Sequence, residues 1–357
     1  MKDLRAQEIL IKRYLDWGKV KERLLRYKYI GSQYKINWLQ HCSKKGPYFC
    51  HYLAWRLGTW EDESWFEFFD GLLANGVSIS NWNSNKNLLK SCNFDEFWGL
   101  VWQLQVAKFF SDEEGLNIKW MRSGPDLEVV TEKGPFYVEC YTYRKSFGIE
   151  EFIKELLGHI DPRIRVGHTS CIKFSLPKNS DTEGFLDDVF RPYLDTEFLQ
   201  REIRQAQLEY PVLLPRPNGA ENLLIYIEGD NPNNYVPGRL GSGMGDPEKY
   251  LKHAIKEALG NKRYSNRLQN HHPNLLAVNF LLGEDLQSAL HRQIRLNREV
   301  PVPDLDSTFD GVFLTACGID EALSIDKMHL KIKQKDHQDH PIFDIEGIKE
   351  AARRVFC

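Results

Sequence analysis

The sequence predicts an α/β fold with a mixed central sheet, and three observations support this prediction. The chain has 357 residues, of which 42% are hydrophobic and 27% charged, so it is long enough for more than one domain and too apolar to stay disordered. Three short runs at 117–122, 126–131 and 136–143 have strand-like patterns and are separated by turn residues. A helical pattern over 247–268 then precedes residues 274–282, whose nearly continuous apolar run is typical of a strand buried on both faces.

The part of the chain before this sheet has a helical pattern. Its apolar side chains recur at helical spacing in segments broken by glycine, and all nine tryptophans fall between Trp17 and Trp120. Asn93 and Glu96 have the spacing of a capping box, so we expect a helix to begin there and to run to about Ser111.

These patterns predict two domains. Residues 1–90 are expected to form a helical, aromatic-rich and basic N-terminal subdomain, and residues 91–357 one α/β domain with an insertion at about 146–245. Weaker patterns predict helices near 149–159, 194–209, 284–293 and 345–355, and strands near 170–176, 222–228 and 309–317. A helix, three consecutive strands, a crossover helix and a buried strand together indicate a mixed sheet.

The composition argues against an exported or membrane-bound protein. The seven cysteines are odd in number and include no Cys-x-x-Cys pair, so neither a disulfide framework nor a zinc ribbon is expected. The first residues carry charges where a signal peptide would have its apolar core, and the longest apolar runs have only the length of a strand. We therefore expect a cytoplasmic protein with no membrane partner.

The net charge of −3 conceals a basic N-terminal arm. The first 45 residues contain twelve Lys or Arg and four Asp or Glu, a balance of +8, so the other 312 residues carry −11. A basic arm on an acidic body is one signature of a protein that binds DNA or RNA. The same run of charge also fits the solvated face of an ordinary helix, and the sequence leaves both interpretations open.

Two carboxylates between residues 123 and 145 are the strongest candidates for chemistry. Asp126 opens one expected strand, and Glu139 lies in the middle of the next, where burial of a carboxylate is costly unless it meets a cation or a donor. If the hairpin places both on one face, they suit a hard divalent ion such as Mg²⁺ or Mn²⁺. That arrangement is typical of metal-assisted phosphodiester hydrolysis.

This pattern resembles the PD-(D/E)XK nuclease superfamily, which has the restriction-endonuclease-like fold. The family signature is a helix, a Pro-Asp at the start of a strand and a Glu-x-Lys on the returning strand, inside an αβββαβ core. Pro125-Asp126 matches the first half and Val138-Glu139 the acidic position of the second, and the likeness covers 93–143 well and 247–282 loosely. The resemblance implies that Asp126 and Glu139 coordinate Mg²⁺, which activates a water against the scissile phosphate.

The motif departs from the family at two positions. Tyr141 stands where the family has its lysine, and Lys145, roughly 20 Å from Glu139 along an extended strand, cannot replace it. Lys262, on the expected crossover helix, is the best candidate for a migrated lysine, because family members often place a Lys or Gln there. Gln103 occupies a helix position that often holds Glu in the family, and Glu96, two turns earlier on nearly the same face, can act instead.

The sequence therefore predicts a Mg²⁺-dependent endonuclease with Asp126 and Glu139 as metal ligands. DNA is favoured over RNA as the nucleic-acid partner, and a homodimer is left open. The main alternative is a catalytically inactive nuclease-like module that binds nucleic acid or a protein partner. The tyrosine at position 141, in place of the lysine, favours this alternative. A weaker third interpretation is a helical interaction protein whose aromatic first third is the binding surface.

Overall fold

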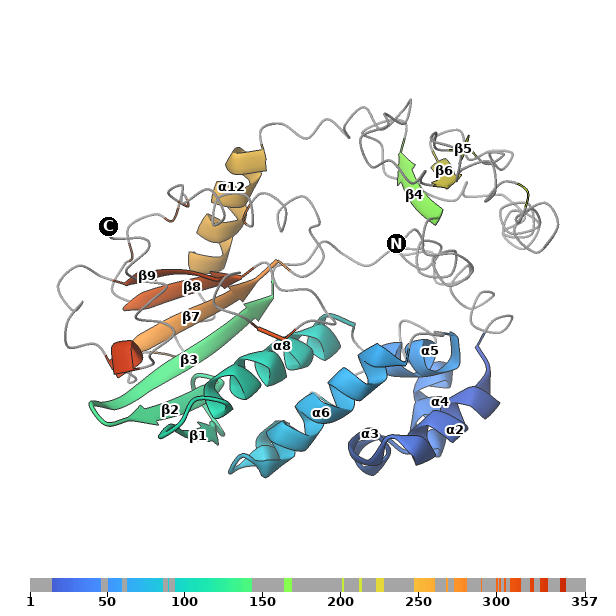
Figure 1. Cartoon of the computed structure of the whole chain (residues 1–357), viewed down its shortest axis with the longest axis horizontal. Helices are drawn as coiled ribbons and strands as arrows, with labels where there is room; N and C mark the ends of the chain where they lie inside the picture. The colour runs from blue at the N-terminus through green and yellow to red at the C-terminus, as the bar shows by residue number, and fades with distance from the viewer. Residues whose placement is uncertain are drawn as a thin grey trace. The chain divides into compact units, whose positions relative to one another are not determined.

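Figure 1 shows the chain as a computed structural model. The structure describes residues 15–45, 51–59, 63–85, 94–142, 247–260, 273–280, 309–315, 328–332 and 341–344, the short strands at 164–168, 212–213 and 223–227, and a few single positions between them. The chain divides into two compact units. The first comprises residues 1–23, 36–61 and 146–244, and the second residues 24–35, 62–145 and 245–357.

A six-stranded mixed sheet forms the centre of the second unit. Its strands lie in the order β1 (Asn117–Trp120), β2 (Leu127–Thr131), β3 (Gly134–Thr142), β7 (Asn274–Asn279), β8 (Gly311–Thr315) and β9 (Met328–Ile332). β1, β2 and β3 pair antiparallel, β7 and β8 continue parallel to β3, and β9 pairs antiparallel to β8. The carboxyl ends of β3, β7 and β8 therefore lie at the same edge of the sheet.

Helix α8 (Phe94–Ser111) covers one face of this sheet (Figure 1). The ring of Trp102 meets that of Phe313 on β8 with centroids 5.9 Å apart, and Phe110 meets Phe136 on β3 at 5.5 Å. The indole N–H of Trp102 also donates to the main-chain carbonyl of Ala277 on β7 at 3.0 Å. The helix thus spans the sheet from the start of β3 to the middle of β7 and β8.

Helix α12 (Pro247–Leu259) covers the opposite face (Figure 1). Its buried Leu251 and Ile255 belong to an apolar cluster that also contains Leu276 and Val278 of β7. Ala277 lies between Leu276 and Val278 along the strand, so its side chain is on the other face, toward α8. The two helices therefore bury opposite faces of β7. All six residues of β7 are buried, as the apolar run predicts.

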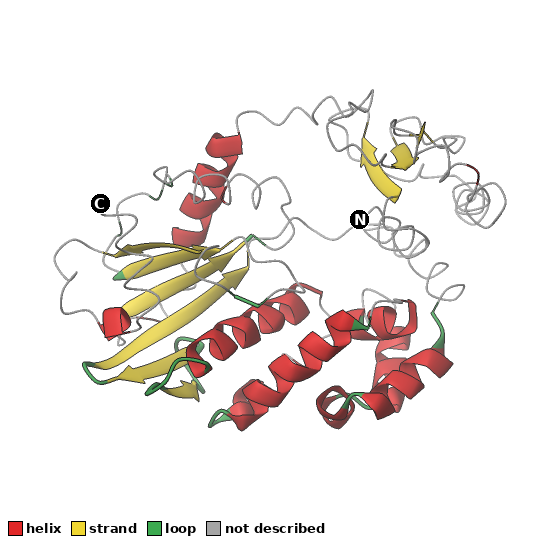
Figure 2. Cartoon of the chain, viewed as in Figure 1, coloured by secondary structure: helices red, strands yellow, loops and turns green. Residues whose placement is uncertain are grey.

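Helices α3 (Lys28–Gln33) and α6 (Ser64–Ser78) also belong to the second unit. The carboxylate of Asp70 on α6 accepts hydrogen bonds from the main-chain N–H groups of Tyr29 and Ile30, at 2.8 and 2.7 Å, and so caps the start of α3 from outside. α6 lies beside α8 (Figure 2). The rings of Phe69 on α6 and Phe97 on α8 are 5.6 Å apart. A 3₁₀ turn, η1 (Trp82–Asn85), follows α6, and another, η4 (Pro341–Asp344), packs on β2 and β3.

The first unit contains helices and a small sheet. Asp16 caps α2 (Trp17–Arg26), because its carboxylate accepts the N–H of Gly18 at 2.7 Å and of Lys19 at 3.2 Å. The last three residues of α2 belong to the second unit. The remaining elements are α4 (Ile36–Lys45), α5 (Tyr52–Thr59) and an antiparallel sheet in the order β4 (Ile164–His168), β6 (Leu223–Ile227), β5 (Val212–Leu213).

Most of the predicted core elements are confirmed. The helix expected from residue 93 begins at Phe94, and strands lie within all three runs of the expected hairpin region and within 222–228, 274–282 and 309–317. β4, β5 and β9 are strands that the sequence analysis did not predict. The expectations that lie wholly or mostly outside the described residues are the helices near 149–159, 194–209, 284–293 and 345–355 and the strand near 170–176.

Two further differences concern boundaries. The helix expected over 247–268 is described as far as Leu259, and Gly260 follows as a turn. α6 lies before the expected domain boundary near residue 90, yet its aromatic face packs on α8 and it groups with the sheet. Among the described residues, no helix is both long enough and apolar enough to cross a bilayer.

The contact between α6 and α8 generates a prediction about stability. A Cβ at Gly76 would overlap the side chain of Leu104 and approach the Trp82 ring to 3.2 Å, whereas a Cβ at Gly71 on the same helix would meet no atom within 4 Å. Gly76→Val should therefore lower the free energy of unfolding by about 2 kcal/mol, and Gly71→Val should leave it nearly unchanged. Urea unfolding of both variants measures this, and equal stabilities would show that this contact is not tightly packed.

Burial of His329 on β9 predicts a pH dependence. Burial, together with the nearby charge of Lys331, lowers the pKa of this imidazole from 6.5 to about 4. The folded state thus favours neutral histidine, so the associated stability is complete above pH 6.5 and is lost as the pH falls toward 4. The loss should be about 2–3 kcal/mol. Urea unfolding at pH 7 and pH 4.5 should show a smaller loss in His329→Leu than in the wild type; an equal loss would contradict this assignment.

Candidate functional site

The β2–β3 hairpin brings the two predicted carboxylates together. Leu127 on β2 pairs with Val138 on β3. Asp126 comes directly before Leu127, and Glu139 comes directly after Val138. The two acids therefore occupy facing positions on adjacent antiparallel strands, where Cβ atoms lie about 5 Å apart. The main-chain N–H of Asp126 donates to the carbonyl of Val138 at 2.9 Å, so the pairing extends to this residue.

Asp126 is held in place by the neighbouring strand. One of its carboxylate oxygens accepts a hydrogen bond from the main-chain N–H of Cys140 at 2.8 Å. The residue lies where β2 begins, directly after the turn Ser123-Gly124-Pro125, and its own carbonyl accepts the N–H of Met121 at 3.1 Å. The carboxylate is partly buried and is positioned by main-chain groups rather than by a flexible side chain.

Glu139 lies in a far more apolar setting. It is only 1% exposed, and its register partner on β7 is Leu276, a member of the apolar cluster beneath α12. Tyr141, two residues later on the same face of β3, packs against that cluster. A carboxylate in such surroundings needs hydrogen-bond donors or a cation to stay charged.

The donor set fits a hard divalent cation. Mg²⁺ is usually held by one or two carboxylates, and waters and substrate phosphates complete its octahedral shell. Asp126 and Glu139 supply two carboxylates from adjacent strands. Within the part of the chain that the structure describes, no group of three or more His, Cys, Asp or Glu side chains is placed to hold a metal.

Gln103 lies on α8, which covers the face of the sheet opposite to that of Asp126 and Glu139, so the structure does not bring it to the two acids. The residue before it, Trp102, donates its indole N–H to the carbonyl of Ala277 on β7. Ala277 pairs with Cys140 on β3, and the N–H of Cys140 donates to Asp126. Gln103 is 9% exposed. Glu96, in the first turn of α8, is exposed, so only the glutamine is buried beside the sheet.

The lysine that the resemblance implies two residues after Glu139 is replaced by a tyrosine. Tyr141 occupies its position and is half-buried against the cluster beneath α12. Lys262, the expected replacement, and Lys145 both lie outside the described residues.

Each of the three parallel strands, β3, β7 and β8, has a polar residue at its carboxyl end. These residues were not among the candidates predicted from the sequence. Thr142 pairs with Asn279, and Asn279 pairs with Thr315, so the three form one row across β3, β7 and β8. Asn279 and Thr315 are completely buried. The available signal was a polar residue interrupting an apolar run, as Asn279 does in the sequence NLLAVNFLL.

One cation of the basic arm is buried. Arg23, one of the twelve Lys or Arg residues counted in that arm, is 3% exposed, and its guanidinium donates to the carbonyl of Leu57 at 2.8 Å. It therefore stabilises the helices of the first unit. Arg26 is exposed and pairs with Glu63 at 3.3 Å, while Lys21 is exposed on α2.

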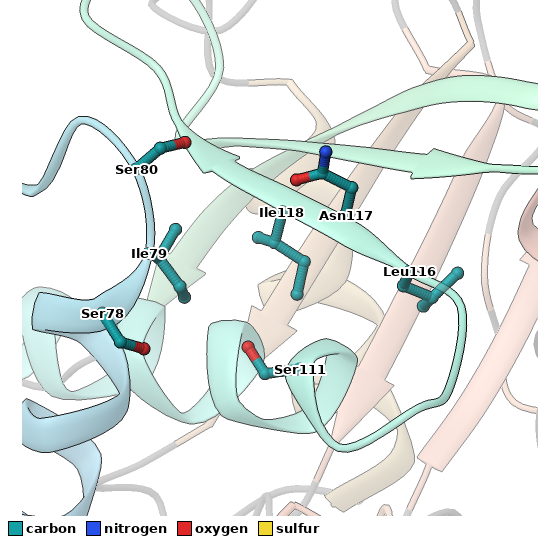
Figure 3. Close-up of a pocket in the computed structure, with 7 residues that line it drawn as sticks. All are labelled: Ser78, Ile79, Ser80, Ser111, Leu116, Asn117 and Ile118. Atoms are coloured by element: carbon teal, nitrogen blue, oxygen red, sulfur yellow. The ribbon is translucent and has the colours of Figure 1, made fainter.

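A shallow open pocket of about 380 Å³ lies away from the carboxylates (Figure 3). Serines from the end of α6 and the end of α8, together with Asn117 and Ile118 of β1, line it. Asn117 pairs with Val130, close to the β2–β3 turn, whereas Asp126 lies at the other end of β2. The pocket is thus separate from the two acids.

Comparison of the chain with protein-family models, with curated proteins and with solved structures gave no significant match. The functional interpretation therefore depends on the residues and geometry of this chain.

The burial of Arg23 generates a prediction that separates structural from surface cations. Arg23→Met leaves the buried Leu57 carbonyl without its donor and should lower the free energy of unfolding by about 1–3 kcal/mol. Lys21→Met, on the exposed face of the same helix, should change it by less than about 0.5 kcal/mol. Urea unfolding of both variants measures the difference. Equal effects would show that Arg23 is as solvated as Lys21.

Proposed function

We propose that this protein is a Mg²⁺-dependent nuclease that hydrolyses phosphodiester bonds of nucleic acid, with DNA the favoured substrate. The observation that carries the proposal is the hairpin register, which gives Asp126 and Glu139 facing positions on β2 and β3. Two carboxylates at this spacing suit a cation that also contacts a substrate phosphate.

The order of elements supports a restriction-endonuclease-like core. Within the second unit, the order α8, β1, β2, β3, α12, β7 gives a helix, three strands, a helix and a strand, the succession expected for the PD-(D/E)XK superfamily; β4, β5 and β6 come between β3 and α12 and belong to the first unit. β3 and β7 pair parallel, as the crossover through α12 requires. Residues 146–244, between β3 and α12 in the sequence, group with the first unit rather than with the sheet.

The chain's own residues would prepare the site for this chemistry. Asp126 and Glu139 would hold the cation, and the N–H of Cys140 fixes the Asp126 carboxylate so that little reorganisation is needed. When bound, Mg²⁺ supplies Lewis-acid stabilisation of the phosphate and lowers the pKa of a bound water. Exposed cations such as Lys21 would contact the phosphate backbone.

An inactive nuclease-like module is the second candidate. Tyr141 in the lysine position favours it, because that lysine would share the charge that develops on the phosphate. Such a module would bind nucleic acid or a protein partner without cutting.

Substitution of the buried acid tests the proposal. Glu139→Gln should lower the rate of metal-dependent cutting of DNA at least about a hundredfold, because a principal electrostatic group is lost. Glu132→Gln is the matched control: Glu132 is exposed and lies in the turn of the same hairpin, at the opposite end from the two acids. It should leave the rate within about twofold of the wild type.

The assay uses purified full-length protein with DNA and RNA substrates in Mg²⁺ and in Mn²⁺. Cutting that persists in Glu139→Gln would exclude this site as its source. Binding without cutting in both metals would favour the inactive module.

A further inference from the structure

The two faces of the β1–β2–β3 meander differ in exposure. The side chains on the face toward α8 are buried: Ile118, Trp120, Leu127 and Val129. On the other face, which also carries the two acids, the side chains of Lys119 and Glu128 are 40% and 20% exposed. A nucleic acid can therefore reach this face of the sheet beside the acids.

Lys119 lies next to Asp126 on this face. Lys119 on β1 is the register partner of Glu128 on β2, and Glu128 comes two residues after Asp126. Asp126 is thus a diagonal neighbour of Lys119, at roughly 7–8 Å, which is within reach of a long side chain. The ammonium group of Lys119 lies 3.3 Å from the Glu128 carboxylate, so the side chain extends over β2.

The main chain around Lys119 is held in place. The N–H of Trp120 donates to the carbonyl of Ser80 at 3.0 Å, and its indole N–H donates to the carbonyl of Gly76 at 2.9 Å. The strand therefore fixes the position of the lysine. Its exposed ion pair with Glu128, in contrast, is weak enough for the ammonium group to exchange one anion for another.

The charges of the proposed site leave a substrate phosphate without a matching positive group. Two ionised carboxylates balance the two charges of Mg²⁺, and a phosphodiester adds a negative charge that needs stabilisation during hydrolysis. Within the described strands, the lysines on this face are Lys119 and Lys331. Lys331 donates to the carbonyl of Val302 at 2.8 Å and lies on β9, three strands beyond β3. Lys119 is therefore the nearer of the two to the acids.

We propose that Lys119 binds an outer oxygen of the scissile phosphate and stabilises the negative charge that develops there. This inference rests on the proposed function and deepens it, because it adds a catalytic residue from β1 to the two acids. In the hydrolysis, water forms a new P–O bond and the P–O bond to one sugar oxygen breaks. The water loses a proton and the leaving oxygen gains one, while Lys119 supplies charge only and forms no covalent bond.

Single-turnover cutting of DNA in Mg²⁺ by the full-length protein tests this assignment. Lys119→Met should lower the rate about a hundredfold, as the loss of one electrostatic group does. Lys119→Arg keeps the charge and should stay within about tenfold of the wild type. Lys108→Met is the matched control, because Lys108 is also 40% exposed and pairs with Asp112, but lies on α8. It should leave the rate within about twofold of the wild type.

Mn²⁺ affinity and thermal stability separate a phosphate contact from a structural role. Lys119→Met should bind Mn²⁺ at least as tightly as the wild type, because loss of a positive charge does not weaken a cation site. Its Tm should equal that of Lys108→Met, since each variant loses one exposed ion pair. A wild-type cutting rate in Lys119→Met would overturn the proposal. An equal loss of rate in Lys119→Arg, or a loss accompanied by weaker Mn²⁺ binding, would also overturn it.

These outcomes are separable from the nuclease proposal. Cutting that Glu139→Gln loses and Lys119→Met retains would leave the enzyme and refute the lysine contact. If the wild type binds DNA in Mg²⁺ without cutting it, the enzyme is refuted and the same buffer tests the contact. Lys119→Met should then lower the salt dependence of binding by about one released ion, and Lys108→Met should not. Equal salt dependence would refute the contact, and a wild type that neither cuts nor binds DNA would refute both.

Discussion

The register of the β2–β3 hairpin is the constraint on which the rest of the site depends. The two strands are joined by a two-residue turn, Glu132-Lys133, and the Thr131 hydroxyl closes it by accepting the N–H of Lys133 and donating to the carbonyl of Gly134. Gly134 has a φ of +127°, a conformation that favours glycine. A slip of one residue would move Glu139 to the opposite face from Asp126. The local chemistry of the turn therefore determines whether the two acids can act together.

The parallel pairing of β3 with β7 extends this local constraint to the whole sheet. It fixes Glu139 beside Leu276 and Cys140 beside Ala277, so the hairpin is locked to a strand that comes about 135 residues later in the chain. α8 and α12 then bury the two faces, and the carboxyl ends of the parallel strands are brought to one edge. In open α/β sheets this edge is where ligands bind, which agrees with the place of the two acids and of the Thr142–Asn279 row.

The sequence predicted the core of the fold because its signals there are local. Strand alternation identified the hairpin, and the apolar run identified β7. β9 was not predicted because His329 and Lys331 interrupt its pattern, although His329 is buried in the fold. The grouping of α6 with the sheet depends on a contact between Phe69 and Phe97, which no periodicity reveals.

The candidate site was predictable to a similar extent. Asp126 and Glu139 follow from a motif with fixed spacing, whereas the row of Thr142 and Asn279 exists only through pairing between distant strands. Arg23 was expected among the phosphate-binding cations because charge counts do not distinguish a buried guanidinium from an exposed one.

The most direct test of the central claim is a measurement of Mn²⁺ binding to the full-length protein by electron paramagnetic resonance. If the hairpin register joins Asp126 and Glu139 in one cation site, the wild type should bind one Mn²⁺ saturably. Asp126→Asn and Glu139→Gln should each weaken that binding about tenfold or more, and Glu132→Gln, in the exposed turn of the hairpin, should leave it unchanged. Saturable binding that both variants retain, or the lack of any saturable binding in the wild type, would contradict the account.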